Sequence, residues 1–264
     1  MLPFFLRHYA PVAARIFVYD DGSTDRSLRI LARERKVTIV PIRTGSESYV
    51  EALRGLYDEC WKRSRGDADW VVVCNVDEHF FHPAGLLAYL DACRDAGVTM
   101  VPAEGYEMLA DRFPAAGAEL SRSVRRGVRA GYLDKLAVFS PDAIDEIRFE
   151  PGRHAANPAG RVVVPEVPEL RLLHYKHLGV DYVRARHAEL RSRRRPGDRD
   201  RSFGGHYEWD ADTIVRAHAE WASRAIDVTP RRRRQAAAWL PWPRRATVVR
   251  PAPLRTSAAA GGVS

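Results

Sequence analysis

The chain of 264 residues has no long hydrophobic run. A helix that crosses a bilayer needs about 20 consecutive apolar residues, and no stretch approaches that length. The apolar start, residues 1–6, has no basic segment before it and is interrupted by Arg7 and His8, unlike a secretory signal. We therefore expect an amphipathic helix at the start and a cytoplasmic protein.

Lysine and cysteine are also scarce. The net charge is +8, yet only four of the 42 basic residues are lysine. Such arginine bias, with abundant Ala, Pro and Gly, is typical of a GC-rich genome, so the charge is weak evidence for a nucleic-acid partner. The cysteines Cys60, Cys74 and Cys93 lack metal-ligand spacing, which favours reduced, structural thiols.

Short apolar runs alternate with helical patterns in the first half of the chain. This order predicts an α/β fold, with a mainly parallel sheet and helices on both faces. The strands expected there are 15–20, 37–42, 69–75 and 98–101, and the helices are 2–10, 26–35, 47–65 and 83–96. Further along, we expect strands at 136–139 and 170–177, an irregular segment at 110–131, and helices at 180–193 and 209–226.

The composition divides the chain into two parts. Residues 1–228 carry the periodic patterns and predict one domain. Residues 229–264 are rich in Arg, Pro and Ala and lack a periodic apolar face, which predicts a flexible tail.

The most informative motif is Asp20-Asp21-Gly22-Ser23-Thr24-Asp25, which follows the apolar run 16–19. Ligands bind outside the carboxyl ends of strands in open α/β sheets. A tight turn would explain the glycine and the serine. It would not explain two adjacent carboxylates, which repel each other unless they bind hydroxyls, N–H groups or a metal. We therefore expect Asp20, Asp21 and Asp25 to bind a ligand.

A second acidic strand end follows the apolar run 70–73. Asn75, Asp77 and Glu78 offer the oxygen atoms that a hard divalent cation prefers. The segment 170–177 ends in His174-Tyr175-Lys176-His177. A neutral imidazole, here His174, is a common metal ligand, and Lys176 could neutralise a phosphate. A basic surface turn is the alternative for that last cluster.

Taken together, these motifs resemble those of the family 2 glycosyltransferases, which have the GT-A fold. The resemblance covers residues 2–210 and implies that Asp21, with Asp20 beside it, contacts the nucleotide of a sugar-nucleotide donor. It implies that the acidic motif holds Mn²⁺ or Mg²⁺ on the donor diphosphate. Asn75 stands where the family has an aspartate, and His79 where it often has an aromatic residue. A subset of similar sequences carries His-Tyr-Lys near this position.

The resemblance implies a sugar transfer that inverts the anomeric centre. The acceptor is a glycan, a lipid-linked molecule or a small molecule. Inverting transfer needs a general base for the acceptor hydroxyl. Asp134 and His154 are both candidates, and the sequence does not separate them.

Family members also have a strand before the first helix, whereas no apolar run precedes the helix at 2–10. Either the start lies further upstream or a central strand has been lost. The first is favoured, because a central gap would leave backbone groups unpaired and open a cavity.

Two other hypotheses remain. A domain lacking this strand would bind a nucleotide sugar without catalysis. The arginine-rich segments 191–201 and 231–234 would instead indicate a basic surface binder. These segments have few aromatic residues for base stacking, so we expect no nucleic acid; peripheral contact with anionic lipids is the better alternative.

Overall fold

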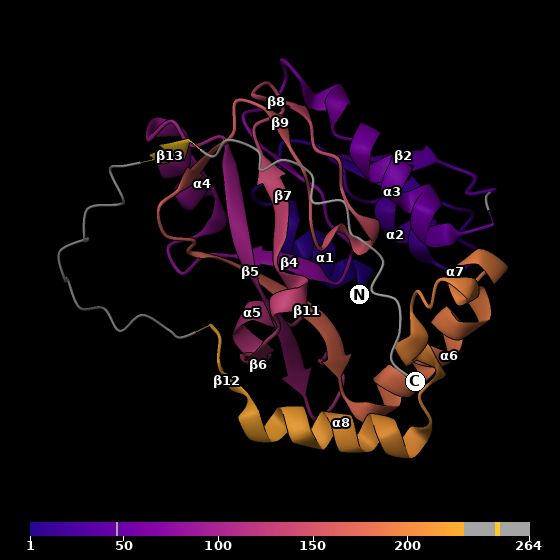
Figure 1. Ribbon diagram of the computed structural model, residues 1–264. Helices are drawn as coiled ribbons and strands as arrows, with labels where there is room; N and C mark the ends of the chain where they lie inside the picture. Colours follow the sequence, from indigo (N-terminus) through magenta and orange to yellow (C-terminus); the bar gives the residue numbers. More distant parts are fainter. Residues whose placement is uncertain (46, 230–245, 249–264) are drawn as a thin grey trace, which may run out of the picture.

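The computed structural model describes residues 1–45, 47–229 and 246–248 (Figure 1). It is a mixed α/β structure, which confirms the predicted class. The helices are α1 (Leu2–Tyr9), α2 (Ser27–Leu31), α3 (Tyr49–Glu59), α4 (Leu86–Asp95), α5 (Leu120–Ser123), α6 (Val180–Arg193), α7 (Pro196–Asp200) and α8 (Ala211–Arg224).

Most strands belong to one seven-stranded sheet with the order β12-β6-β5-β11-β4, in which β7 pairs with both β5 and β3. Its members are β3 (Val71–Val72), β4 (Glu78–Phe81), β5 (Met100–Ala110), β6 (Arg126–Arg129), β7 (Lys135–Phe139), β11 (Leu170–Leu178) and β12 (Ile226–Asp227). Smaller pairs are β1 (Ile16–Asp20) with β2 (Val37–Pro41), β8 (Ile144–Glu146) with β9 (Ala159–Gly160), and β10 (Val163–Pro165) with β13 (Ala246–Val248).

The seven-stranded sheet is mixed rather than mainly parallel, which corrects the sequence-based prediction. Among the described residues of this sheet, β11 and β5 are the only parallel pair, and the other pairings are antiparallel. The strand–helix alternation from which we predicted a parallel sheet is confined to the first half of the chain. Strands β6 and β7 follow β5 with only short helical turns between them, and each pairs antiparallel with β5.

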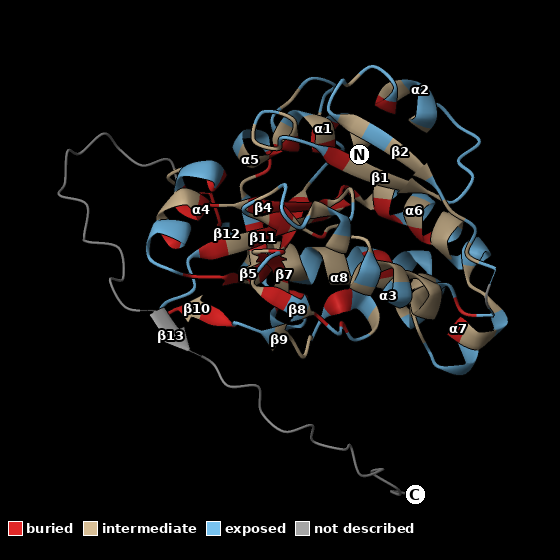
Figure 2. Cartoon of the chain, turned by 90° about the horizontal axis from the view of Figure 1, so that it is seen from above, coloured by how far each residue is buried: buried red, intermediate tan, exposed pale blue. Residues whose placement is uncertain are grey.

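The centre of this sheet forms the core. Leu170, Leu172 and Leu173 of β11 have no exposed surface, and neither has Met100 of β5. Strand β5 continues to Ala110, well beyond the predicted end at residue 101. Figure 2 shows this buried centre in β4, β5 and β11.

The helices in the second half are close to the prediction. Helix α6 has the predicted bounds, and α8 lies inside the predicted range 209–226. Asp210 begins α8 because its side chain accepts a hydrogen bond from the Thr213 N–H. Helix α3 ends at Glu59, six residues before the predicted end.

The predicted tail, residues 229–264, lies almost wholly outside the described residues. Its described part is Thr229, which is buried, and β13, which pairs with β10 in antiparallel register. Within the described ranges, no helix is both long enough and apolar enough to cross a bilayer.

Candidate functional site

A cavity of about 2330 Å³ lies between β1 and the strand segment 71–74. Its polar end gathers most of the residues singled out in the sequence. Those that line the cavity are Asp20, Asp21, Asp25, Asn75, Asp77, Glu78, His154, His174 and Lys176. The exception is Asp134, whose carboxylate accepts a hydrogen bond from the Gly105 N–H at 2.8 Å and forms an ion pair with Arg129.

The carboxylates after β1 have different partners. Asp20 accepts hydrogen bonds from the N–H groups of Gly22 and Ser23, so it closes its own turn. Gly22 has a φ of +80°, a conformation that glycine adopts without strain. Asp21 instead accepts bonds from the N–H and hydroxyl of Thr44, which lower the pKa of its carboxyl. Asp21 is therefore an ionised group held in place at the cavity.

Asp25 lies on the outside of the same turn. It is exposed, and its carboxylate accepts a hydrogen bond of 2.8 Å from the Ser27 N–H at the start of α2. This bond closes the turn that leads into α2, although the Asp25 side chain also borders the cavity.

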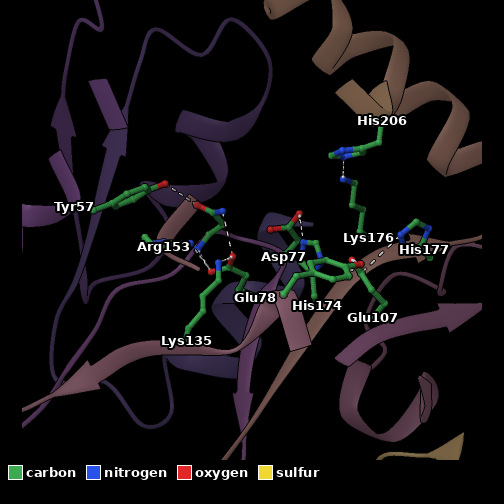
Figure 3. Close-up of polar contacts among 12 residues, drawn as sticks. Tyr57, Asp77, Glu78, Glu107, Lys135, Arg153, His174, Lys176, His177 and His206 are labelled. Carbon is green, nitrogen blue, oxygen red and sulfur yellow. Dashed lines mark hydrogen bonds and ion pairs between the residues drawn. The ribbon is translucent and has the colours of Figure 1, made fainter. Parts of the chain in front are cut away.

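On the opposite side of the cavity, His174 lies between two carboxylates (Figure 3). Its Nδ1 is 2.8 Å from Oε2 of Glu107, and its Nε2 is 3.6 Å from Oδ2 of Asp77. Burial disfavours the imidazolium, but Glu107 and Asp77 outweigh burial and raise the pKa of His174 to about 10. Burial likewise opposes ionisation of Asp77, but His174 holds its pKa well below the usual range.

The sheet register explains this arrangement. In β11, His174 pairs with Glu107 of β5 on one side and with Glu78 of β4 on the other. The Tyr175 N–H donates to the Asp77 carbonyl at 2.8 Å, which fixes the Asp77 loop beside β11. The pairing of β11 with β5 shifts register between His174 and His177, and such bulges commonly redirect side chains next to sites.

Lys176 extends the positive side of the cavity. Its Nζ lies 2.6 Å from Nε2 of His206 and 4.6 Å from the centre of the Tyr207 ring. Burial lowers the pKa of His206 to about 3, so the ring is neutral and accepts a hydrogen bond from the lysine. Burial lowers the pKa of Lys176, while Glu107 and Asp77 oppose that effect. Arg186 of α6 also lines the cavity, where it forms an ion pair of 2.6 Å with Glu189 and acts electrostatically on Asp77.

Glu78 has a different role from its neighbour Asp77. It is buried between two cations, with Lys135 Nζ at 2.5 Å and Arg153 Nη2 at 2.7 Å (Figure 3). Burial opposes its ionisation, but Arg153 and Lys135 outweigh burial and lower the pKa of Glu78 to about 2. Each of its carboxylate oxygens accepts from a buried cation, so Glu78 holds the site together.

The four residues predicted to bind metal differ in their freedom to do so. Asn75 Oδ1 accepts from the Tyr57 hydroxyl at 2.9 Å, and its Nδ2 donates to Glu78. Asp77 and His174 are better suited, because one ion can bridge an oxygen and a nitrogen 3.6 Å apart when each bond is about 2.1 Å. Glu107 on Nδ1 supplies the outer carboxylate that commonly orients a metal-binding histidine.

Among the described residues, no group of three or more His, Cys, Asp and Glu side chains is arranged to hold an ion alone. A cation at Asp77 and His174 would therefore need ligands from phosphate oxygens and water.

The two residues predicted as candidate bases, Asp134 and His154, have different surroundings. His154 follows the 3₁₀ turn Pro151–Arg153 and lines the cavity. Partial burial, together with the charge of Lys135, lowers the pKa of His154, so its ring is neutral and able to accept a proton near pH 7. Gly152 has a φ of +75°, and a Cβ there would lie 2.5 Å from the His154 ring. The positive φ therefore favours glycine at this position, and a larger residue would also displace the His154 ring.

Sequence reasoning missed Glu107, which lies in a segment that we left unassigned. Only the pairing of β5 with β11 brings Glu107 to His174.

No model of a known protein family matches the chain, and no curated protein matches it. The functional interpretation therefore depends on the motifs and on the geometry of the cavity.

Proposed function

We propose that this protein is a glycosyltransferase with a GT-A-like domain that transfers a sugar from a nucleoside diphosphate sugar to a hydroxyl acceptor. The observation that carries the proposal is the meeting of two kinds of groups at one end of one cavity. Asp21 lies at the end of β1, while Asp77, His174 and Lys176 lie on the wall formed by the main sheet.

These groups suit the parts of such a donor. Ionised Asp21 is able to accept hydrogen bonds from ribose hydroxyls or a base N–H. Lys176 and Arg186 provide positive charge for a diphosphate. The distribution of charge therefore supports a ligand with a polar nucleoside at one end and phosphates in the middle.

A divalent cation, Mn²⁺ or Mg²⁺, fits Asp77 and His174, with Glu107 behind the imidazole. When bound, such an ion stabilises negative charge on the departing diphosphate. To ligate an ion, His174 would have to lose the proton that Asp77 and Glu107 now favour, and the positive charge of the ion promotes this loss.

We assign the general base to His154 rather than to Asp134, because His154 borders the cavity and Asp134 is bonded elsewhere. The acceptor oxygen attacks the anomeric carbon while its proton passes to the imidazole of His154. The bond from the anomeric carbon to the phosphate oxygen breaks, and the nucleoside diphosphate leaves. Attack from the face opposite the leaving group inverts the anomeric centre.

The experiment is a turnover assay with a panel of uridine and guanosine diphosphate sugars, measuring release of nucleoside diphosphate with Mn²⁺ present. His154→Ala should lower kcat by roughly 100-fold or more, the contribution expected of a general base. Asp134→Asn should change kcat less, and Asp95→Asn, in an exposed residue that ends α4, is the matched control. Equal rates for the His154 and Asp95 variants would contradict the assignment.

A further inference from the structure

Helix α6 connects the two ends of the cavity along the chain. It begins at Val180, shortly after Lys176 in β11, and it ends at Arg193, two residues before Arg195. Lys176 lies on the wall formed by the main sheet, whereas Arg195 lies beside Asp21 at the end of β1. Figure 1 shows α7 at the end of α6, on the side of the molecule that carries α2 and α3. The segment after α6 therefore brings the second half of the chain to the acidic end of β1.

The Arg195 side chain reaches Asp21 through Thr44. Its two terminal nitrogen atoms donate to the carbonyl oxygen and the hydroxyl oxygen of Thr44, the second at 2.7 Å. The N–H and the hydroxyl of Thr44 in turn donate to the two carboxylate oxygen atoms of Asp21, the N–H at 3.1 Å. The Thr44 hydroxyl thus accepts from a guanidinium and donates to a carboxylate, so the three residues form one relay of charge-assisted hydrogen bonds.

The backbone of Arg195 is held by Asp198 of α7. Asp198 is 2% exposed, and its carboxylate accepts a hydrogen bond of 3.1 Å from the Arg195 N–H. The same carboxylate accepts from the Ser48 hydroxyl at 2.6 Å and from the N–H groups of Tyr49 and Val50 at the start of α3. A buried carboxylate is stable only when it is bonded in this way, and the start of a helix favours negative charge. Asp198 therefore ties the segment that carries Arg195 to α3.

Gly197 allows this segment to lie close to the residues before α3. Its N–H donates to the Glu47 carbonyl at 3.2 Å, and a Cβ on Gly197 would lie only 3.1 Å from that oxygen. The segment 195–198 is thus bonded to Thr44, to Glu47 and to the start of α3. These bonds fix the place from which the Arg195 side chain reaches Thr44.

We propose that Arg195 positions Asp21 for the nucleoside of the donor, acting through Thr44 and without touching the ligand. Asp21 follows β1 in an exposed turn, where an aspartate side chain can adopt several rotamers. The relay selects one of them, so that ligand binding does not have to order this side chain. Each carboxylate oxygen has two lone pairs, which leaves Asp21 able to accept further hydrogen bonds from a ligand. The identity of that ligand rests on the proposed function, whereas the positioning of Asp21 does not.

The test measures binding of uridine diphosphate and guanosine diphosphate by calorimetry in the presence of Mn²⁺. Arg195→Met and Thr44→Val should each weaken binding of the preferred nucleotide roughly tenfold. Arg195→Lys should not restore it, because one ammonium group does not reproduce the fork that spans both oxygen atoms of Thr44. Inorganic pyrophosphate should bind all variants equally, since Asp77 and its surroundings are unaltered. Arg199→Met, in an exposed arginine of α7, is the matched control and should change neither affinity.

A double variant distinguishes positioning from direct contact with the ligand. If Arg195 acts through Thr44, adding Thr44→Val to Arg195→Met should weaken nucleotide binding little further, because both changes break the same relay. Fully additive losses would mean that Arg195 touches the ligand itself. Equal losses of pyrophosphate and nucleotide affinity would mean that the substitutions only disturb the fold. Either result would overturn the proposal.

Hydrogen exchange of the Thr44 amide tests the relay with no ligand present. Because this amide bonds to Asp21, it should exchange on the order of tenfold faster in Arg195→Met than in Arg199→Met. Unchanged exchange would overturn the positioning role, whatever the protein binds. Faster exchange in a protein that binds neither nucleotide would support the relay and contradict the proposed function.

Discussion

His174 joins two carboxylates from different parts of the chain, with Nδ1 2.8 Å from Glu107 and Nε2 3.6 Å from Asp77. One imidazole thus links the middle of β5 to the loop between β3 and β4. The orientation of Nε2 depends on the bond that Glu107 accepts from Nδ1. Glu107 is therefore a positioning residue, although it has no place in any sequence motif.

Replacing Glu107 with glutamine should weaken Mn²⁺ binding, because the amide orients His174 less strongly and makes it a weaker ligand. Loss of such outer carboxylates typically costs about 10–100-fold in metal affinity. Titration calorimetry with Mn²⁺ in the presence of a nucleoside diphosphate measures the change. Glu104→Gln, on the same strand but with its carboxylate bonded to the Tyr106 hydroxyl rather than to His174, is the control. Unchanged affinity in the Glu107 variant would contradict the orienting role.

Replacing Glu78 with glutamine should destabilise the fold strongly, because Lys135 and Arg153 would remain buried without a counter-charge. Breaking a buried ion pair from one side typically costs about 3–5 kcal/mol. Glu146→Gln is the matched control, since Glu146 forms an exposed ion pair with Lys62 worth less than about 1 kcal/mol. Urea unfolding at neutral pH compares the two variants, and similar losses in both would be inconsistent with the buried cluster.

Acid should destabilise the protein partly through His187 of α6. This ring is 3% exposed, and neither nitrogen has a hydrogen-bond partner. Burial and then the charge of Lys176 lower the pKa of His187 to about 4. The unfolded chain binds a proton below about pH 6.5, while the folded chain does not do so until about pH 4, so stability falls as pH decreases through this window.

His187→Leu should remove that contribution. When the pH is lowered from about 7.5 to 5, the free energy of unfolding should decrease in both proteins. The decrease should be about 2 kcal/mol smaller in the variant than in the unaltered protein. Urea unfolding at both pH values measures the difference. An identical pH dependence in both proteins would show that His187 is protonated without cost in the folded state.

Replacing Asp21 with asparagine should weaken binding of the nucleoside part of the donor, because the amide is neutral and donates where the carboxylate accepts. We expect a loss of roughly tenfold, the worth of one hydrogen bond to a charged group. The change in affinity is measured by fluorescence competition with free nucleoside diphosphate. Asp25→Asn changes an exposed residue whose carboxylate closes the turn before α2, so it should affect affinity less. A larger loss of affinity in the Asp25 variant than in the Asp21 variant would place the nucleoside near Asp25.

The first motifs could be located from the sequence because each is local. An apolar run ending in Asp20 and Asp21 predicts a strand end, and β1 ends at Asp20. The mixed direction of the main sheet could not be found this way, because it depends on which distant strands meet. The sequence also does not predict that Asp77 and Glu78 have different roles. They are adjacent in sequence, and their roles differ because Glu78 binds the buried cations Lys135 and Arg153, 57 and 75 residues further along.

The site at the polar end of the cavity is tested most directly by calorimetric binding of a nucleoside diphosphate sugar with and without Mn²⁺. We expect Mn²⁺ to strengthen donor binding in the unaltered protein, and we expect Asp77→Asn to abolish that effect while Asp95→Asn retains it. Donor affinity that is the same with and without Mn²⁺, and the same in the Asp77 variant, would contradict the account.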